Sequence, residues 1–262
     1  MDTFGNRFHV NFLGYVHWFM SIRTSKMKDH SISVDQAKYA TSIVAKYLDT
    51  EKEQVSTKVY KTTLTADMIL TKEYISTSDE QFDKFTREFN INYKGFIVLL
   101  IDLLPTRLYL SFTLHKFAKF SANPGKLQFE LFVHLLRHIR DSNTLGLKYY
   151  SDMNDAPVTD LLRQASIKTE NHLIAFSDSS WQDFLDTGRS TGAYVIFYQV
   201  GKIYHSTHVP LPVSQSSAES CYNTACTTGM DLAHFIMLIH EVLNKDPYMV
   251  PEEAPLIVLD SK

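Results

Sequence analysis

The sequence is poor in the residues that stabilise small secreted proteins or build structural metal sites. Only two cysteines occur in 262 residues, Cys221 and Cys226. Both fall in one predicted helix, where two thiols alone form neither a disulfide framework nor a zinc site. The low cysteine content fits a reducing compartment.

Long hydrophobic runs are also absent from the sequence. The longest, Phe96–Leu104, has nine residues, contains Asp102 and is followed by Pro105. A membrane-spanning helix needs about 18 to 20 apolar residues, and the N-terminal residues lack the basic and apolar regions of a secretory signal. We therefore predict no membrane partner and an intracellular location, cytoplasmic or nuclear.

The sequence also lacks a large excess of positive or negative residues. The formal net charge is −3, so any contact with nucleic acid would need a local basic surface. Hydrophobic residues make up 44% and aromatic residues 13% of the chain, which is typical of a globular protein and argues against disorder. The length suits one large domain or two ordinary ones.

The first part of the chain is predicted to begin with strands. Residues 8–34 have the composition of a β-hairpin or a pair of edge strands. Asp35 is the predicted N-cap of a helix over residues 36–48, whose apolar positions follow helical spacing. The polar residues 49–90 show no pattern that predicts an element.

Helices are predicted for most of residues 93–140. Pro105 and the turn Ser121–Gly125 divide this region into three apolar, helix-like segments: 93–104, 107–120 and 126–140. One side of the third segment carries four basic residues: His134, Arg137, His138 and Arg140. We interpret that side as a solvated helix surface, with phosphate contact as the alternative. Residues 145–150 are predicted to form a strand.

The last part of the chain has a different order of elements. A polar stretch at 151–171 is interpreted as a linker between a domain at 1–150 and a domain at 172–262. The second domain is predicted to contain a strand, a hairpin, a long helix and a final strand, at 172–176, 191–208, 217–244 and 256–259. This order predicts an α/β (α+β overall) fold with a mixed sheet.

Three carboxylates lie at the predicted ends of these elements. Asp178 follows the first strand, Glu219 lies in the first turn of the long helix, and Asp260 follows the last strand. Gathered in one place they would repel each other unless a cation held them, and oxygen ligands favour Mg²⁺ or Mn²⁺. Each also has a purely structural interpretation, as a turn residue or a helix-dipole partner.

Other residues near Asp178 in the sequence are given structural or surface positions without a catalytic role. Asp183 and Asp186 are predicted to be exposed loop acids, and Trp181 to pack beneath the site. His205 and His208 are predicted to lie on a strand surface.

Four basic side chains are candidates for contacts with nucleic-acid phosphates. They are Arg137, Arg140, Arg189 and Lys202.

The segments Ser177–Tyr198, Ser214–Cys226 and Leu256–Lys262 resemble the ribonuclease H domain of copia-type LTR retrotransposon Pol polyproteins. The resemblance implies a ribonuclease H-like sheet in which Asp178, Glu219 and Asp260 bind two Mg²⁺ or Mn²⁺ ions. The implied reaction is hydrolysis of RNA in an RNA–DNA hybrid.

Upstream, residues 8–48 resemble the end of the reverse transcriptase palm, and residues 93–150 resemble the thumb and connection of the same polyproteins. The rest of the Pol polyprotein is therefore an implied partner. Residues 49–92 match nothing in that family.

The sequence departs from this family in three ways. It contains no adjacent aspartates, so the polymerase active site is absent. The head of the long helix carries Glu219 where the family usually has two glutamates, and no fourth acid follows Asp260. We therefore expect an incomplete ribonuclease H domain with little or no hybrid cleavage. A non-catalytic nucleic-acid-binding or interaction module and a decayed reading frame are the alternatives.

Overall fold

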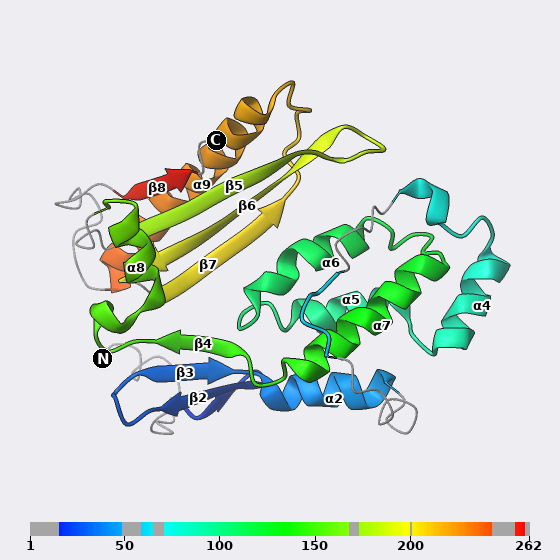
Figure 1. Ribbon diagram of the computed structural model, residues 1–262, viewed down its shortest axis with the longest axis horizontal. Coiled ribbons are helices and arrows are strands. Elements are labelled where there is room, and N and C mark those ends of the chain that lie inside the picture. The colour runs from blue at the N-terminus through cyan, green and yellow to red at the C-terminus, as the bar shows by residue number, and fades with distance from the viewer. Residues whose placement is uncertain are drawn as a thin grey trace, which may run out of the picture.

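The computed structural model describes residues 16–48, 59–64, 71–167, 173–199, 201–242 and 255–259. Two four-stranded sheets and a group of helices make up these residues (Figure 1). Helices and mixed sheets occur together, so the predicted α/β fold is confirmed. Asp260 and residues 8–15 lie outside the described residues.

The first sheet is antiparallel and joins two distant parts of the chain. Its strands, in spatial order, are β1 (Trp18–Phe19), β2 (Ile22–Lys26), β3 (Ile32–Asp35) and β4 (Gly146–Tyr149). The predicted hairpin is present as β2 and β3, and the strand predicted at 145–150 is β4, which pairs with β3.

Asp35 ends strand β3 and is not the N-cap of the helix that follows. Helix α2 (Ala37–Tyr47) has Gln36 as its N-cap. The carboxylate of Asp35 still accepts the backbone N–H of Ala37 at 3.0 Å, and it pairs with Arg23 at 2.9 Å. The prediction was therefore wrong by one residue, because the ladder with β2 extends through Asp35.

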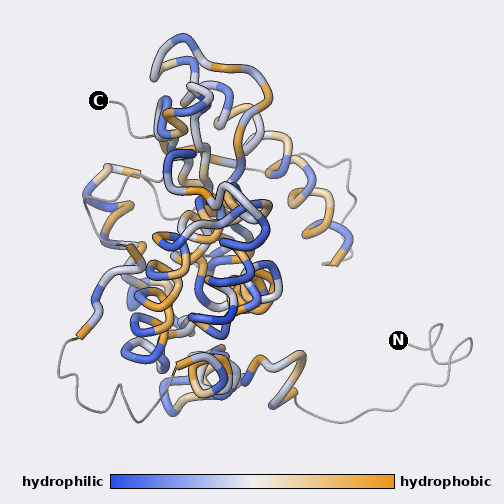
Figure 2. Tube along the Cα trace, turned by 90° about the vertical axis from the view of Figure 1, so that its right-hand side faces the viewer, coloured by the Kyte–Doolittle hydropathy of each residue, from blue (hydrophilic) through white to orange (hydrophobic). Residues whose placement is uncertain are grey.

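Four further helices surround an aromatic core. They are α4 (Asp79–Phe89), α5 (Tyr93–Ile101), α6 (Ser111–Ala118) and α7 (Lys126–Asp141). The three predicted helical segments are present as α5, α6 and α7. Figure 2 shows hydrophobic and hydrophilic residues alternating along the helical coils, as expected for helices with one buried side.

The centre of this core is the ring of Phe132 on α7. Its centroid lies 4.2 Å from that of Tyr93, 4.4 Å from that of Phe117 and 4.8 Å from that of Phe96. All four side chains are fully buried. Rings from three helices therefore fix the angles at which α5, α6 and α7 pack.

The stretch predicted to be a linker contains ordered structure. Within residues 151–171 lies helix α8 (Pro157–Gln164), which begins with proline at its first position. Thr159 and Leu162 on this helix are buried. Helix α8 is therefore packed against its neighbours.

The second sheet is mixed and carries the predicted acids. Its strands are β7 (Gly201–His208), β6 (Arg189–Tyr198), β5 (Leu173–Phe184) and β8 (Leu256–Leu259), in that spatial order. β5 pairs antiparallel with β6 and parallel with β8. Helix α9 (Ser217–Val242) connects β7 to β8 and covers one face of the sheet (Figure 1).

The contact between α9 and the sheet is close. Thr228 on α9 donates a hydrogen bond to Ser177 on β5 at 3.2 Å. Leu232 packs against Ala175 and Tyr194. At Gly192 a Cβ atom would lie 2.9 Å from Cγ2 of Thr224, so only glycine fits there without displacement of α9.

Helix α6 binds the end of strand β5 through charged side chains. Lys116 pairs with Asp183, and Lys119 pairs with Asp186 at 3.1 Å. Both ammonium groups lie 4.4 Å from the ring centroid of Phe184, which is buried. The prediction of an exposed loop acid is wrong for Asp183, which lies in β5 and is partly buried, whereas Asp186 is an exposed residue in the turn after β5.

Among the described residues, no helix is long and apolar enough to cross a membrane.

Candidate functional site

Asp178 lies inside a long strand, where the sequence predicted a strand end. β5 continues to Phe184 because its antiparallel ladder with β6 extends beyond the parallel ladder with β8. The parallel ladder stops at the pair Ser177 and Leu259, the residues that precede Asp178 and Asp260 in the sequence. Asp178 is therefore the first residue of β5 beyond this ladder.

The side chain of Asp178 is exposed and lies on the face of the sheet opposite α9. Ser177 and Ser179, its neighbours in β5, contact Thr228 and Cys221 of α9 at 3.2 Å each. Because side chains alternate along a strand, Asp178 projects from the other face. Its Oδ1 accepts the backbone N–H of Ser179 at 2.8 Å.

Glu219 lies in the first turn of α9, as predicted, and it helps to cap the helix. Its backbone N–H donates to Oγ of Ser216 at 3.1 Å, and its own Oε2 accepts the N–H of Gln215 at 2.7 Å. This arrangement resembles a capping box, in which a serine and a glutamate satisfy backbone donors at a helix start. Glu219 therefore has a structural role at the start of α9, and the residue is exposed.

In the structure, residues that are close in sequence to Asp178 and Glu219 contact each other. The contact between Ser179 and Cys221 joins the residue after Asp178 to the first turns of α9, two residues after Glu219. Asp260 lies outside the described residues. Within the described part of the chain, no group of three His, Cys, Asp or Glu side chains lies close enough to hold a metal ion.

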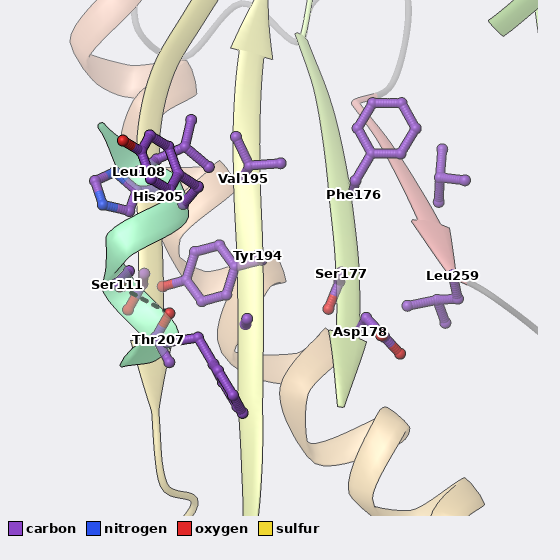
Figure 3. Close-up of a pocket in the computed structure, with 15 residues that line it drawn as sticks. Leu108, Ser111, Phe176, Ser177, Asp178, Tyr194, Val195, His205, Thr207 and Leu259 are labelled. Carbon is purple, nitrogen blue, oxygen red and sulfur yellow. Dashed lines mark hydrogen bonds between the residues drawn. The ribbon is translucent and has the colours of Figure 1, made fainter. Parts of the chain in front are cut away.

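A pocket adjoins Asp178 on the face of the sheet opposite α9 (Figure 3). This sheet pocket has a volume of about 580 Å³, which is within the size range of small-molecule sites. The following residues line it: Leu108, Tyr109, Ser111, Phe112, Phe176, Ser177, Asp178, Ala193, Tyr194, Val195, His205, Ser206, Thr207, Val258 and Leu259.

The helical part of the chain closes one side of the sheet pocket. Ser111, at the start of α6, donates a hydrogen bond to Thr207 of β7 at 2.9 Å. Figure 3 shows this bond beside His205, with Phe176 and Asp178 on the far side of the pocket. Sequence reasoning missed this pocket, because no pattern indicates that α6 lies against β7.

The sequence predicted that His205 and His208 lie on a strand surface. In the structure both belong to β7, and both are partly buried. Burial, assisted by the charge of Lys202, lowers the pKa of His205 to about 4. Burial also lowers the pKa of His208, whose two ring nitrogens have no hydrogen-bond partner among the described residues. Trp181, predicted to pack beneath the site, is 43% exposed and donates its indole N–H to Ser214.

Three of the four predicted phosphate-contacting residues are engaged within the protein. Lys202 is buried and donates to the carbonyl of Pro105 at 3.2 Å. Arg140 pairs with Asp141 at 2.8 Å, and the guanidinium of Arg137 lies 5.4 Å from the ring centroid of Tyr60. Arg189, in contrast, is exposed.

The basic side of α7 is partly covered, so it is not the open, solvated helix surface that the sequence predicted, and phosphate contact by Arg137 and Arg140 stays a prediction. The segment 59–64 lies along it. His138 Nδ1 donates to the carbonyl of Tyr60 at 2.8 Å, and His134 Nε2 donates to that of Thr62 at 2.9 Å. The prediction was wrong because residues 59–64, which have no pattern of their own, supply acceptors for these histidines.

No protein-family model, no curated protein and no solved structure matches this chain.

Proposed function

We propose that this chain derives from a copia-type Pol polyprotein and that residues 173–259 form a ribonuclease H-like module for RNA–DNA hybrids. The observation that carries the proposal is the strand order β7-β6-β5-β8, with β5 and β8 parallel and α9 between β7 and β8. This order agrees with the sheet that the sequence resemblance implies. Asp178 directly follows the end of the parallel ladder, where such a module carries its first acid.

The donor set has the oxygen chemistry of a divalent-metal site, although Asp178 projects from the sheet face opposite α9, which carries Glu219. Asp178 and Glu219 present exposed carboxylates, and Asp260 is the third ligand in the proposal. Oxygen-only donors favour Mg²⁺ or Mn²⁺ over softer metals. Two such ions would activate water and stabilise the leaving 3′-oxygen. The residues of the chain would position the ions and the hybrid.

A second candidate is a non-catalytic nucleic-acid-binding or interaction module. The role of Glu219 as a helix cap favours it, because this glutamate has a structural reason to be present without any metal. The two candidates differ in a measurable way, since only the first requires a metal-dependent cleavage step.

Metal binding and hybrid cleavage together test the proposal. Titration calorimetry with Mn²⁺ on the whole chain is expected to show binding that is lost in Asp178→Asn. The matched control is Asp160→Asn on α8, which removes an exposed carboxylate elsewhere, and it should leave Mn²⁺ binding unchanged. Equal Mn²⁺ binding by the wild type and Asp178→Asn would contradict the metal site.

A labelled RNA–DNA hybrid then separates the candidates. We expect little or no cleavage by this chain in Mg²⁺ or Mn²⁺. Metal-dependent cleavage that disappears in Asp178→Asn would assign the enzyme. Hybrid binding with neither cleavage nor Mn²⁺ binding would favour the non-catalytic module, and absence of both hybrid binding and cleavage would contradict both candidates.

A further inference from the structure

A second cavity lies away from Asp178, between β4, β7 and the start of α8. This Lys202 cavity has a volume of about 230 Å³. Its lining includes apolar side chains of three separate segments, Leu147, Phe197 and Val158, together with Lys202. It is smaller than the roughly 300 to 1,000 Å³ of pockets for drug-sized ligands, so it suits a smaller molecule.

Lys202 is an unusual residue for such a lining. The residue is only 9% exposed, and its ammonium group donates one hydrogen bond, to the neutral carbonyl of Pro105. No aspartate or glutamate lines the cavity, and no ion pair of Lys202 occurs among the described residues. Burial of an ammonium group without a counter-charge is unfavourable. Burial accordingly lowers the pKa of this amine to about 8.

The backbone around the cavity adds positive potential and holds Lys202 in place. Helix α8 begins at the cavity with Pro157, which has no backbone N–H, and the N–H of Thr159 donates to the carbonyl of Ala156 at 2.9 Å, so the helix start contributes the N–H of Val158 and the positive end of its dipole. On the opposite side, the hydroxyl of Tyr149 donates to the backbone carbonyl of Lys202 at 2.8 Å. An anion in the cavity would thus meet an ammonium group and a helix N-terminus.

We propose that the Lys202 cavity binds a small organic carboxylate, with the carboxylate group on the Lys202 ammonium and the hydrocarbon part against Leu147 and Phe197. The mostly apolar lining and the single buried cation favour a monoanion that carries a hydrocarbon group over a phosphate dianion, which would need more donors. This inference concerns a different site and does not depend on the proposed function.

Benzoate is the probe that tests the site, with benzyl alcohol as its neutral counterpart. Titration calorimetry on the whole chain is expected to show binding of benzoate and none of benzyl alcohol. In Lys202→Met the dissociation constant for benzoate should rise by at least about tenfold, the effect of losing a hydrogen bond to a charged group. Lys126→Met, an exposed lysine on α7, is the matched control and should bind benzoate as the wild type does.

Two results would overturn the proposal: no benzoate binding by the wild type, or equal binding by Lys202→Met. A second measurement uses the wild type alone, in case the variant does not fold. Benzoate should protect Lys202 from reductive methylation by formaldehyde and cyanoborohydride, measured by peptide mass, while benzyl alcohol should not. Absence of this protection would equally contradict the carboxylate site.

Discussion

Lys116 of α6 and Asp183 of β5, 67 residues apart in the sequence, form an ion pair whose side chains are only 15% and 12% exposed. Asp183 also accepts a hydrogen bond from Thr191 of β6. One carboxylate thus joins a helix of the first part of the chain to two strands of the second sheet.

Removal of this pair should weaken the protein more than removal of a surface pair. In a double-mutant cycle with Lys116→Met and Asp183→Asn, we expect a coupling energy of about 1 to 3 kcal/mol in the free energy of unfolding, measured by urea denaturation. The control cycle is Lys126→Met with Glu130→Gln, an exposed pair at 3.8 Å. Its coupling should be at most about 0.5 kcal/mol. Equal coupling in both cycles would contradict a special role for Lys116 and Asp183.

Gly192→Ala should destabilise the second sheet by roughly 1 to 3 kcal/mol, because the new methyl group overlaps Thr224 on α9. The double variant Gly192→Ala with Thr224→Ala removes the overlapping atoms and should recover part of the loss. Thermal melting of the three proteins measures both effects. If Thr224→Ala brings no recovery, the steric explanation is wrong.

His205 should make the protein less stable in acid. Its pKa is about 4 in the folded protein and 6.5 as an ordinary histidine, so between these pH values the unfolded chain binds more protons. The free energy of unfolding therefore falls as the pH falls from about 6.5 towards 4. Its contribution is roughly 1 to 3 kcal/mol, since one pKa unit corresponds to about 1.4 kcal/mol.

His205→Gln should accordingly reduce the loss of stability between pH 7 and pH 4.5, measured by urea denaturation at each pH. Some loss should remain, because burial also lowers the pKa values of His115 and His208. The control is His17→Gln at an exposed histidine, which should follow the wild-type curve. A variant curve parallel to the wild-type curve would rule out His205 as the cause.

Ser216→Ala should cost about 1 kcal/mol of stability, because Oγ of Ser216 accepts the N–H of Glu219 at the start of α9. Ser217→Ala, one residue later at an exposed position, should cost much less. Since Ser216 is not a proposed metal ligand, its replacement should leave Mn²⁺ binding intact. Loss of Mn²⁺ binding in Ser216→Ala would mean that the cap and the metal site cannot be separated.

The sequence predicted elements with strong periodicity and missed contacts between distant segments. The hairpin of β6 and β7, the long helix α9 and the aromatic helices α5 and α7 follow from apolar spacing alone. Helix α4 was missed because most of its residues are polar, although Phe82, Phe85 and Phe89 recur at helical spacing and all three rings pack against Phe129. Its start is nevertheless marked by Ser78, which accepts the N–H of Gln81.

The environment of charged residues was the least predictable feature. Asp183, Asp186 and Lys202 lie in polar or mixed local sequence, which is typical of exposed positions. Their partners, Lys116, Lys119 and Pro105, are 67 to 97 residues away. Their environment is determined by the packing of α6 and its flanking residues against β5 and β7. No local sequence pattern predicts this packing.

The strand order of the second sheet has a consequence for assembly. β7 and β8 are its two outer strands, and β7 is held by Ser111 of α6 and Tyr149 of β4. Among the described residues, β8 pairs with β5 alone. As far as the described residues show, a strand from another molecule would extend this sheet at β8, by hydrogen bonding to the backbone of Leu256–Leu259. Within the described part of the chain, β8 is thus the outer strand that has contacts on one edge only.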